Sequence, residues 1–281
     1  MSIYGNPIML GASGGSSGIP LLSRVEWNAL STAQKQAYGL VAVQDANSGF
    51  DQGELYYGAN YIPIGEYIPN SDNTKIICEA FVENFSGSTS AESWGDGTHP
   101  ITMQYGLNPI VDAGENAVYL GISATGKFAY VDLGATAAPY TAYIVAKLVS
   151  PGTYTRVLSS MAARNSGQGM LLYGSTINVS SWASDTNTGV SSSSYFAAAL
   201  QYDGTQTTQG HGIVGSNGSY ISKNPVTSSQ YLAIGRTDID SSSANAEPAN
   251  MYVRYFAVTT AYESESTIKA NLANLESVFI N

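Results

Sequence analysis

The feature that most constrains the fold is a long series of short apolar-rich segments that glycine-containing turns separate. The segments lie between residues 74 and 260, with turn signals such as Gly106, Gly126 and Gly204 between them. Many short strands at regular spacing are typical of two antiparallel sheets packed face to face. We therefore predict an all-β fold, a two-sheet antiparallel jelly-roll sandwich. The predicted strands are TKIICEAFVEN, ITMQYGL, AVYLGISA, KFAYVDLG, YTAYIVAKLV, YTRVLSSMA, GMLLYGS, TINVSSW, SYFAAALQYD, HGIVGSNGSYISKN, YLAIGR and MYVRYFAVTT.

The last fifty or so residues carry the clearest local pattern. YLAIGR and MYVRYFAVTT have apolar side chains on both faces, which indicates strands packed on both sides. The period then changes, because Ile268, Leu272, Leu275 and Phe279 fall at helical spacing. The order predicted is strand, polar loop, strand and short closing helix. The apolar stripe of that helix is expected to pack on the sandwich, with an oligomer contact as the alternative.

The beginning of the chain has a different composition. Residues 1–22 are rich in glycine and serine, and Ser23 and Glu26 match a capping box at a helix start. One bent helix or two short helices, a strand at LVAVQD and a turn-rich connector with a short hairpin are expected next. We divide the chain into a small N-terminal helical arm, 1–65, for anchoring or oligomer contact, and the jelly-roll domain, 66–281.

Charge and hydropathy exclude two classes of partner. The net charge is −10 and the 11 lysines and arginines are not clustered, whereas a surface that tracks phosphates needs clustered basic groups. We therefore expect that the protein does not bind nucleic acid. No apolar run approaches the ~20 residues of a membrane helix, and MSIYGNPIML lacks the basic start of a signal peptide. We expect neither a signal peptide nor membrane insertion. The single cysteine, Cys78, is expected to be a small buried hydrophobe.

The strand order from Asn73 to Leu275 resembles concanavalin A-like, laminin-G-like jelly-roll domains. The resemblance rests on CEAFVENF, YIVAKLV followed by TRVLSSM, GMLLYGS, SYFAAALQYDGT, YLAIGR and MYVRYFAVTT. The strand ending in A-x-x-Y-D-G usually carries a tryptophan, and Tyr195–Phe196 stands in its place here. The resemblance implies a binding or structural module rather than an enzyme.

The N-terminal part resembles segments of tailed-phage virion proteins. This resemblance rests on Trp27, Leu30, Lys35 and Tyr38, followed by GLVAVQD, after a glycine-rich start. It implies a virion surface protein for capsid decoration, a head fibre or tail adhesion. Trp27, Leu30 and Tyr38 are the expected anchoring residues. Other virion proteins and further copies of the chain, in a homo-oligomer, are the expected partners.

Catalytic chemistry finds little support in the sequence. A jelly-roll glycosidase would carry paired carboxylates on one strand, commonly as E-x-D-x-x-E, and this pattern is absent. Glu79 and Glu83 are expected on one strand face as two solvent-facing acids. The two histidines, His99 and His211, match no nucleophile or zinc motif. We predict a protein that is not an enzyme, with a laminarinase-like glycoside hydrolase as the remote alternative.

Sugar binding is the sharper hypothesis. Trp94 and Trp182 lie in polar, loop-like settings, where an aromatic ring can stack on a pyranose face. Asp96, His99, Asp185 and Asn187 are expected to read the hydroxyl groups, so host or mucosal glycans are the expected ligand. The alternatives are that the two tryptophans cap the ends of the sandwich or lie in a subunit interface. A stand-alone lectin-like module is the alternative to a virion protein.

Calcium is the one metal that the sequence suggests. Asp96 lies in WGDGTHP, and Asp185 and Asn187 lie in SDTNTG, which we predict to be loops. Laminin-G-like domains often bind calcium at a sheet rim through such oxygen ligands, so the resemblance implies a calcium site there. Ordinary turn chemistry is the alternative reading of the same residues.

Overall fold

The computed structural model separates into two compact units, residues 1–63 and 64–281. The residues that it describes are 21–23, 26–27, 30, 32–38, 40–44, 53–57, 64–85, 93–104, 107, 109–122, 127–134, 139–163, 166–181, 184–204, 209–224, 230–236 and 248–280. Among these residues, no helix is long and apolar enough to cross a membrane.

The N-terminal unit contains a three-stranded sheet and one short helix in its described part. The strands are β1 (Leu21–Ser23), β2 (Leu40–Gln44) and β3 (Gly53–Tyr57), and the helix is α2 (Thr32–Ala37). β1 pairs with β2 in parallel, and β2 pairs with β3 in antiparallel. The predicted strand at LVAVQD is β2. The arm is therefore a small α/β unit rather than a mainly helical one, because β1 and β3 complete a sheet around that strand.

The capping box predicted at the start of the arm is present. Both Ser23 N–H and Ser23 Oγ donate to Glu26 Oε2 at 2.8 Å, and Glu26 N–H donates to Ser23 Oγ at 3.2 Å. Hydrogen bonds from Ser23 hold the pKa of Glu26 below its ordinary value. This local pairing satisfies backbone donors that a helix start otherwise leaves free.

The expected anchoring residues lie at the centre of the N-terminal unit. Trp27 and Val41 are buried together, and Leu30 and Tyr38 pack against them. The rings of Trp27 and Tyr38 meet edge to face at 6.0 Å, and Lys35 Nζ lies 5.4 Å from the centre of the Trp27 ring. These side chains therefore build the core of their own unit, and their role in anchoring remains a prediction.

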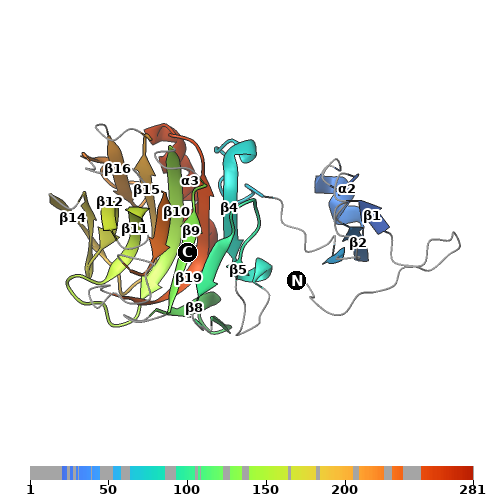
Figure 1. The fold of residues 1–281 in the computed structure, drawn as a ribbon, viewed down its shortest axis with the longest axis horizontal. Coiled ribbons are helices and arrows are strands. Elements are labelled where there is room, and N and C mark those ends of the chain that lie inside the picture. Colours follow the sequence, from blue (N-terminus) through green and yellow to red (C-terminus); the bar gives the residue numbers. More distant parts are fainter. Residues whose placement is uncertain are drawn as a thin grey trace, which may run out of the picture. The chain divides into compact units, whose positions relative to one another are not determined.

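The second unit is an antiparallel two-sheet β-sandwich with one C-terminal helix, as predicted (Figure 1). In its described part, the β10 sheet has eight strands in the order β17-β16-β15-β10-β19-β8-β7, with β4 also pairing with β19. Its strands are β4 (Ile76–Phe81), β7 (Ile110–Asp112), β8 (Ala117–Gly121), β10 (Tyr140–Leu148), β15 (Phe196–Tyr202), β16 (Gly210–Val214), β17 (Ile221–Lys223) and β19 (Asn250–Thr259). Short 3-10 helices, Asn73–Lys75 and Val82–Asn84, flank β4.

The facing layer, the β11 sheet, also has eight strands in the described residues, in the order β14-β13-β12-β11-β18-β9-β6-β5. They are β5 (Ser93–Trp94), β6 (Ile101–Gln104), β9 (Phe128–Asp132), β11 (Arg156–Ala163), β12 (Ser166–Tyr173), β13 (Thr176–Ser180), β14 (Asp185–Ser191) and β18 (Tyr231–Ile234). The strands predicted from the sequence are present. β5, β7 and β14 were not predicted, because two are very short and the third is polar.

The core lies between the two sheets, where glycines allow the layers to approach closely. A Cβ at Gly210 would lie 2.3 Å from Met170 Sδ, and a Cβ at Gly212 would lie 2.5 Å from Val179 Cγ1. β16 therefore packs directly against β12 and β13, and glycine at these two positions follows from that contact.

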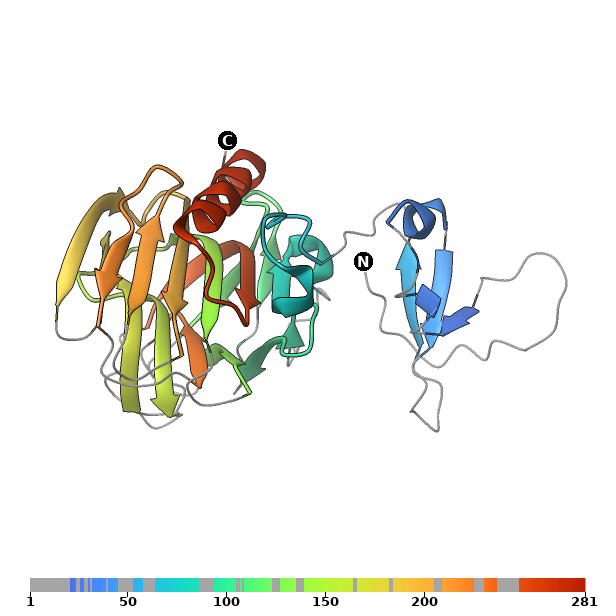
Figure 2. The same ribbon diagram turned by 90° about the horizontal axis from the view of Figure 1, so that it is seen from above.

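The closing helix α3 (Glu265–Phe279) covers part of the outer face of the β10 sheet (Figure 2). Ser264 caps its N-terminus, because Ser264 Oγ accepts from Thr267 N–H at 3.1 Å. Ile268, Leu272 and Leu275 are buried, and the helix contacts β15 and β10. The predicted packing of the apolar stripe on the sandwich is confirmed.

A buried polar network joins the start of this helix to the sheet. Glu263 accepts hydrogen bonds from the Tyr143 hydroxyl and, at 3.1 Å, from Thr259 Oγ1. Gln201 Nε2 donates to Glu263 O at 2.7 Å, and Asn271 Nδ2 donates to Tyr143 Oη at 3.1 Å. Burial and the Glu263 charge raise the pKa of Tyr143. Because each of these groups has partners, the network fixes the helix on the sheet.

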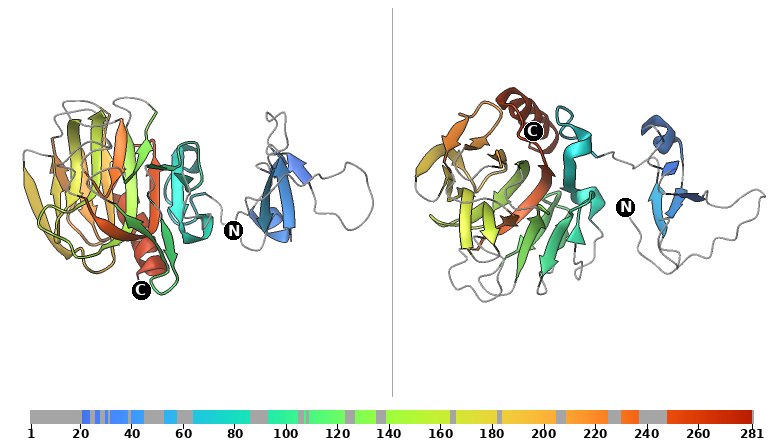
Figure 3. Two further views of the ribbon diagram at one scale, coloured as in Figure 1. Left: turned by 60° about the horizontal axis from the view of Figure 1, so that its bottom comes forward. Right: turned by 45° about the horizontal axis from the view of Figure 1, so that its top comes forward.

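Residues 64–72 lie beside α3 and begin the second unit (Figure 3). Asn70 N–H donates to Asn271 Oδ1 at 3.0 Å, and Asn274 Nδ2 donates to Tyr67 O at 3.0 Å. Gly65 has a φ of +86°, in the region that favours glycine, and its N–H donates to Glu79 Oε2 at 2.6 Å. This segment and α3 together cover part of the outer face of the β10 sheet.

One lysine joins the free edges of the two sheets. Lys223 on edge strand β17 is 7% exposed, and its Nζ donates to Ser184 Oγ at 3.1 Å and to Thr186 Oγ1 at 2.9 Å. Thr186 belongs to β14, the edge strand of the facing sheet. The two layers are therefore linked along this side by a buried ammonium group.

Candidate ligand-binding surface

The outer face of the β11 sheet carries a row of polar and aromatic side chains across four strands. The strand register pairs Arg156 with Tyr173, Tyr173 with Asn178, and Asn178 with Asn187. Directly paired residues of an antiparallel sheet project from the same face. Their chain neighbours Leu172, Ile177 and Val179 point into the core, so this row faces outward.

Two tyrosine rings form the centre of this surface. Tyr154 lies in the turn before β11, and its ring stacks on Tyr173 with 6.4 Å between centroids and 19° between planes. Tyr154 is 60% exposed, whereas Tyr173 is buried beneath it. The guanidinium of Arg156 lies 4.5 Å from the Tyr173 ring centre. Tyr173 and Arg156 therefore support Tyr154, which presents a flat ring to solvent.

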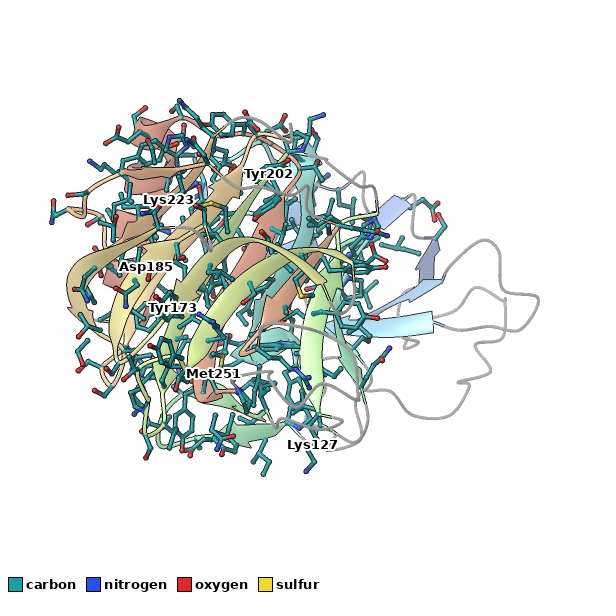
Figure 4. All side chains as sticks on the ribbon, turned by 60° about the vertical axis from the view of Figure 1, so that its left-hand side comes forward. Lys127, Tyr173, Asp185, Tyr202, Lys223 and Met251 are labelled. Carbon is teal, nitrogen blue, oxygen red and sulfur yellow. The ribbon has the colours of Figure 1, made fainter. Side chains whose placement is uncertain are left out.

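A carboxylate and an amide lie beside these rings. Asp185 is exposed on β14 near Tyr173, and Figure 4 shows the two residues close to each other. Burial, and then the neighbouring Asp185 carboxylate, raise the pKa of Tyr173 to about 12. Asn187 is exposed two residues along β14, and its Oδ1 accepts from Gly189 N–H at 2.8 Å. We call Tyr154, Arg156, Tyr173, Asp185 and Asn187 the β14 patch.

The β14 patch combines the two elements that sugar recognition requires. An exposed aromatic ring can lie against the C–H face of a pyranose, while a carboxylate and an amide can bind its hydroxyl groups. The supporting contacts of Tyr173 and Arg156 hold the ring in place before a ligand arrives, which lowers the entropy lost on binding.

Two of the predicted glycan-binding residues, Asp185 and Asn187, belong to this patch, but their setting differs from the prediction. They lie on strand β14 rather than in a loop. The segment DTNTGVS alternates exposed and half-buried positions along its length. Its polar composition and its glycine gave it the appearance of a loop.

Trp94 is not available for stacking on a sugar, contrary to the prediction. It is 2% exposed, and its Nε1 donates to Phe81 O at 3.0 Å and to Asn84 Oδ1 at 3.1 Å. Its ring packs edge to face against Phe85. Its polar sequence neighbours concealed a core position at the end of the sandwich, which was the alternative reading. Trp182 lies outside the described residues.

Asp96 and His99 lie far along the sheet from the β14 patch. Asp96 is exposed, and its Oδ2 accepts from Asn84 Nδ2 at 2.9 Å. His99 is half-buried, and a Cβ at Gly134 would lie 3.0 Å from its ring. These residues follow β5, at one edge of the β11 sheet, whereas Asp185 lies on β14 at the other edge (Figure 1).

A single calcium ion cannot be held by Asp96, Asp185 and Asn187 together, which corrects the prediction. Seven interstrand steps of about 4.8 Å separate β5 from β14 along the sheet, whereas calcium ligands lie within ~2.6 Å of the ion. Among the described residues, no group of three or more histidine, cysteine, aspartate or glutamate side chains could hold a metal.

Glu79 and Glu83 do not share a solvent-facing surface, contrary to the prediction. Strand β4 ends at Phe81 and residues 82–84 form a 3-10 turn, so the strand period does not reach Glu83. Glu83 is exposed, but Glu79 is fully buried on the outer face of the β10 sheet beneath residues 64–72. The pair therefore lacks the geometry of a glycosidase acid pair.

Glu79 has an unusual environment for a carboxyl group. It accepts from the Tyr255 hydroxyl at 2.7 Å and from Gly65 N–H at 2.6 Å. Burial raises its pKa to about 7, with smaller contributions in the same direction from Asp96 and Glu66. Both carboxyl oxygens are committed to the covering segment and the sheet, so the group has a structural place.

His211 also has structural partners. Its ring stacks on Tyr220 with centroids 4.2 Å apart, and its Nδ1 is 2.8 Å from the Tyr262 hydroxyl. Burial lowers its pKa. His211 lies on β16, between β15 and β17.

The sequence did not single out Tyr154, Arg156 or Tyr173. They stand in YTRVL and LLYGS, which were assigned to strands without reference to their outward faces. The available signal was the alternation itself, because Tyr173 and Asn178 alternate with the apolar core residues of β12 and β13.

The fold and this surface define the class of protein: a two-sheet antiparallel β-sandwich with an aromatic and polar patch on one outer face. No protein-family profile matches the chain, and no curated protein is similar in sequence.

Solved structures with a similar arrangement are β-sandwich domains at low sequence identity. One is the botulinum neurotoxin DC binding domain in complex with SialylT, with 12% identity and a TM-score of 0.46 over 73% of this chain and 52% of that chain. Another is domain 4 of AbnA, an extracellular GH43 arabinanase of Geobacillus stearothermophilus, in complex with arabinotriose. It has 11% identity and a TM-score of 0.47 over 70% of this chain and 98% of that chain. This chain spans about half the length of the neurotoxin domain. Similarity at this level carries no inference about function.

Proposed function

We propose that the protein is a non-enzymatic glycan-binding protein whose sandwich binds sugar at the β14 patch. The observation that supports this most directly is the exposed Tyr154 ring, stacked on Tyr173 and bordered by Asp185 and Asn187. A supported ring beside hydroxyl-binding groups matches the two demands of a pyranose. Host-surface or mucosal glycans are the proposed ligands.

A glycan array with the full chain, followed by calorimetric titration of its best ligand, tests this proposal. Tyr154→Ala should weaken binding about tenfold, because an aromatic stacking contact contributes on the order of 1 kcal/mol. Asp185→Ala should weaken it by a similar factor. Tyr154→Phe is the matched control, because it keeps the ring and should bind like the unmodified protein. Absence of glycan binding, or binding that ignores both alanine variants, would reject the proposal.

We also propose that residues 1–63 attach the sandwich to a larger particle. Support comes from the separate compact unit that these residues form, with its own core around Trp27 and Val41. The specific particle indicated by the sequence resemblance is a tailed-phage virion, with the sandwich on its surface in capsid decoration, a head fibre or tail adhesion. The chain would act there as a homo-oligomer in contact with other virion proteins.

Removal of residues 1–45 distinguishes this attachment from a stand-alone lectin-like module. The truncated protein should keep its glycan binding but fail to assemble into particles in a complementation assay. Sedimentation of the full chain checks the homo-oligomer. Normal incorporation of the truncated protein would contradict the attachment role without affecting the glycan proposal.

A further inference from the structure

A second outward row crosses the β10 sheet on the opposite side of the sandwich from the β14 patch. The strand register pairs Ile110 with Tyr119, Tyr119 with Tyr252, and Tyr252 with Lys147. Tyr195, just before β15, continues the row, because Lys147 Nζ lies 5.1 Å from the centre of its ring. The row spans five neighbouring strands, or about 19 Å at about 4.8 Å per step.

The members of this row remain accessible, unlike the part of the same face that α3 covers. Ile110 is 52% exposed, and Tyr119, Tyr252, Lys147 and Tyr195 are all partly exposed. The rings of Tyr119 and Tyr252 lie 5.2 Å apart and are tilted by 50°. Lys147 Nζ lies 5.1 Å from the ring centres of both Tyr252 and Tyr195. Rings therefore recur along the row with a cation between two of them.

The row is held rigidly from one side by Glu115 and Arg254. Arg254 Nε and Nη2 donate to Glu115 O at 3.0 and 2.8 Å, and its Nη1 donates to Phe279 O at the end of α3. The guanidinium of Arg254 lies 3.6 Å from the Tyr195 ring centre. The register of β10 and β19 shifts at Arg254, and such bulges redirect side chains. This support fixes the rings before any ligand binds.

The charges of the row are balanced within the protein. Lys147 Nζ pairs with Glu115 Oε1 at 2.6 Å, and this hydrogen bond lowers the pKa of Glu115. Asp112 lies near Tyr252 and is opposite in sign to Arg254. Two cations and two anions leave no net charge, in a chain whose overall charge is −10. An acidic polymer would find no excess of positive charge here.

A protein partner fits this surface less well. Stable protein interfaces bury above about 1,000 Å² around an apolar centre. Ile110 is an exposed large aliphatic side chain at the edge of the row on β7, and Val149 is another, two residues beyond Lys147. A narrow line of hydroxyl-bearing rings with ammonium and carboxylate groups between them suits a chain of sugar rings better.

We propose that the row of Ile110, Tyr119, Tyr252, Lys147 and Tyr195 is a second binding surface, which takes an extended, uncharged polysaccharide. Successive sugar rings lie on Tyr119, Tyr252 and Tyr195, and the unused Lys147 N–H groups donate to their hydroxyls. This surface is independent of the β14 patch, because the two lie on opposite outer faces of the sandwich. The row would bind polysaccharide chains, in addition to the glycans that we propose for the β14 patch.

Native affinity electrophoresis of the full chain in gels of neutral soluble polysaccharides tests this proposal. Mixed-linkage β-glucan, xyloglucan, galactomannan and dextran serve as probes, with heparin as the acidic polymer. At least one neutral polymer should retard the protein. Tyr252→Ala and Tyr119→Ala should each weaken this retardation about tenfold. Tyr252→Phe and Tyr154→Ala should behave like the unmodified protein, and thermal melting confirms that each variant is folded.

Three results would overturn the proposal. The first is that no neutral polysaccharide retards the protein, or that heparin alone does. The second is retardation that both alanine variants keep; loss in Tyr154→Ala instead would place the polymer on the β14 patch and leave only the earlier proposal standing. The third is self-association that Tyr252→Ala abolishes, because the row would then be a contact between copies.

Discussion

The same pair of chemical groups, a tyrosine hydroxyl and a carboxyl, occurs on the outer face of each sheet in opposite environments. Tyr255 donates to Glu79 beneath the segment 64–72, where the carboxyl is fully buried. Tyr173 lies near Asp185 on β14, where the carboxylate is exposed. The difference teaches that burial beneath another segment, rather than the pair itself, decides the role of the two groups. The covered pair fixes the fold, and the open pair remains available to a ligand.

The largest effect expected from this comparison is on stability. Glu79→Ala leaves two buried donors, Tyr255 Oη and Gly65 N–H, without an acceptor and opens a cavity. It should lower the free energy of unfolding by about 4 kcal/mol. Asp185→Ala is the matched variant on the open face and should cost at most about 0.5 kcal/mol. Urea denaturation at pH 6 measures both, and equal losses would refute the distinction between the two pairs.

The second effect concerns pH. Glu79 has a pKa of about 7 in the folded protein against an ordinary 4.5, so the folded state keeps a proton that the unfolded chain loses. Its contribution to the unfolding free energy is present below pH 4.5, declines as pH rises to about 7, and is constant above that. The decline amounts to at most ~3 kcal/mol.

Glu79→Gln removes this pH-dependent contribution. Comparing the variant with the unmodified protein therefore separates the effect of Glu79 from the effects of other carboxylates. The difference in unfolding free energy between the two proteins should change between pH 4.5 and 7.5 and be flat above pH 8. Glu66 and Asp96, which add to the raised pKa, should shift the midpoint slightly downward when either is changed to its amide. A constant difference across the whole range would show that Glu79 does not titrate there.

A smaller effect tests how firmly α3 is held on the outer face of the β10 sheet. Ser264→Ala removes the acceptor for Thr267 N–H at the start of α3 and should cost about 1 kcal/mol. Ser266→Ala, two residues later in the same exposed turn, is the matched control and should change stability by less than about 0.5 kcal/mol. Hydrogen exchange of the backbone amides around Tyr143 should be faster in Ser264→Ala and unchanged in Ser266→Ala. Equal stability and equal exchange rates in the two variants would indicate that the Ser264 cap contributes nothing to holding α3 on the sheet.

The smallest stability effect is expected at the open pair. Tyr173→Phe removes the hydroxyl near Asp185 and keeps the ring that supports Tyr154. It should change the unfolding free energy by about 0.5 kcal/mol and alter ligand affinity more than stability. Calorimetric titration measures the ligand affinity, and urea unfolding of the same preparation measures the unfolding free energy. A stability loss matching that of Glu79→Ala would mean that the open pair is structural as well.

Local patterns in the sequence predicted local structure well. The apolar alternation of MYVRYFAVTT gave a central strand, the helical spacing after it gave α3, and Ser23 with Glu26 gave a capping box. Each of these signals depends on residues within a few positions of one another. The two-sheet sandwich followed because many such strands can bury their apolar faces only against a second layer.

The site could be predicted only in part, because its environment comes from distant segments. Trp94 has polar neighbours in sequence, but Phe81 and Asn84 enclose its ring in space. Glu79 is buried by residues that a strand pattern does not reveal, since Gly65 and Tyr255 lie far from it along the chain. Asp185 was found as a residue but assigned to a loop, because the half-buried positions of its strand include the polar Thr186 and Thr188, which conceal the alternation.

The buried ammonium of Lys223 has a consequence for behaviour at high concentration. A free sheet edge offers unpaired backbone groups to any other strand, which is the first step toward fibrous aggregates. On one side of the sandwich the free edges are β17 and β14, and Lys223 ties them to each other through Ser184 and Thr186. A strand arriving there would have to pair beside an inward-pointing charge. We therefore expect Lys223, which takes no part in either proposed binding surface, to hinder strand pairing between molecules at this edge.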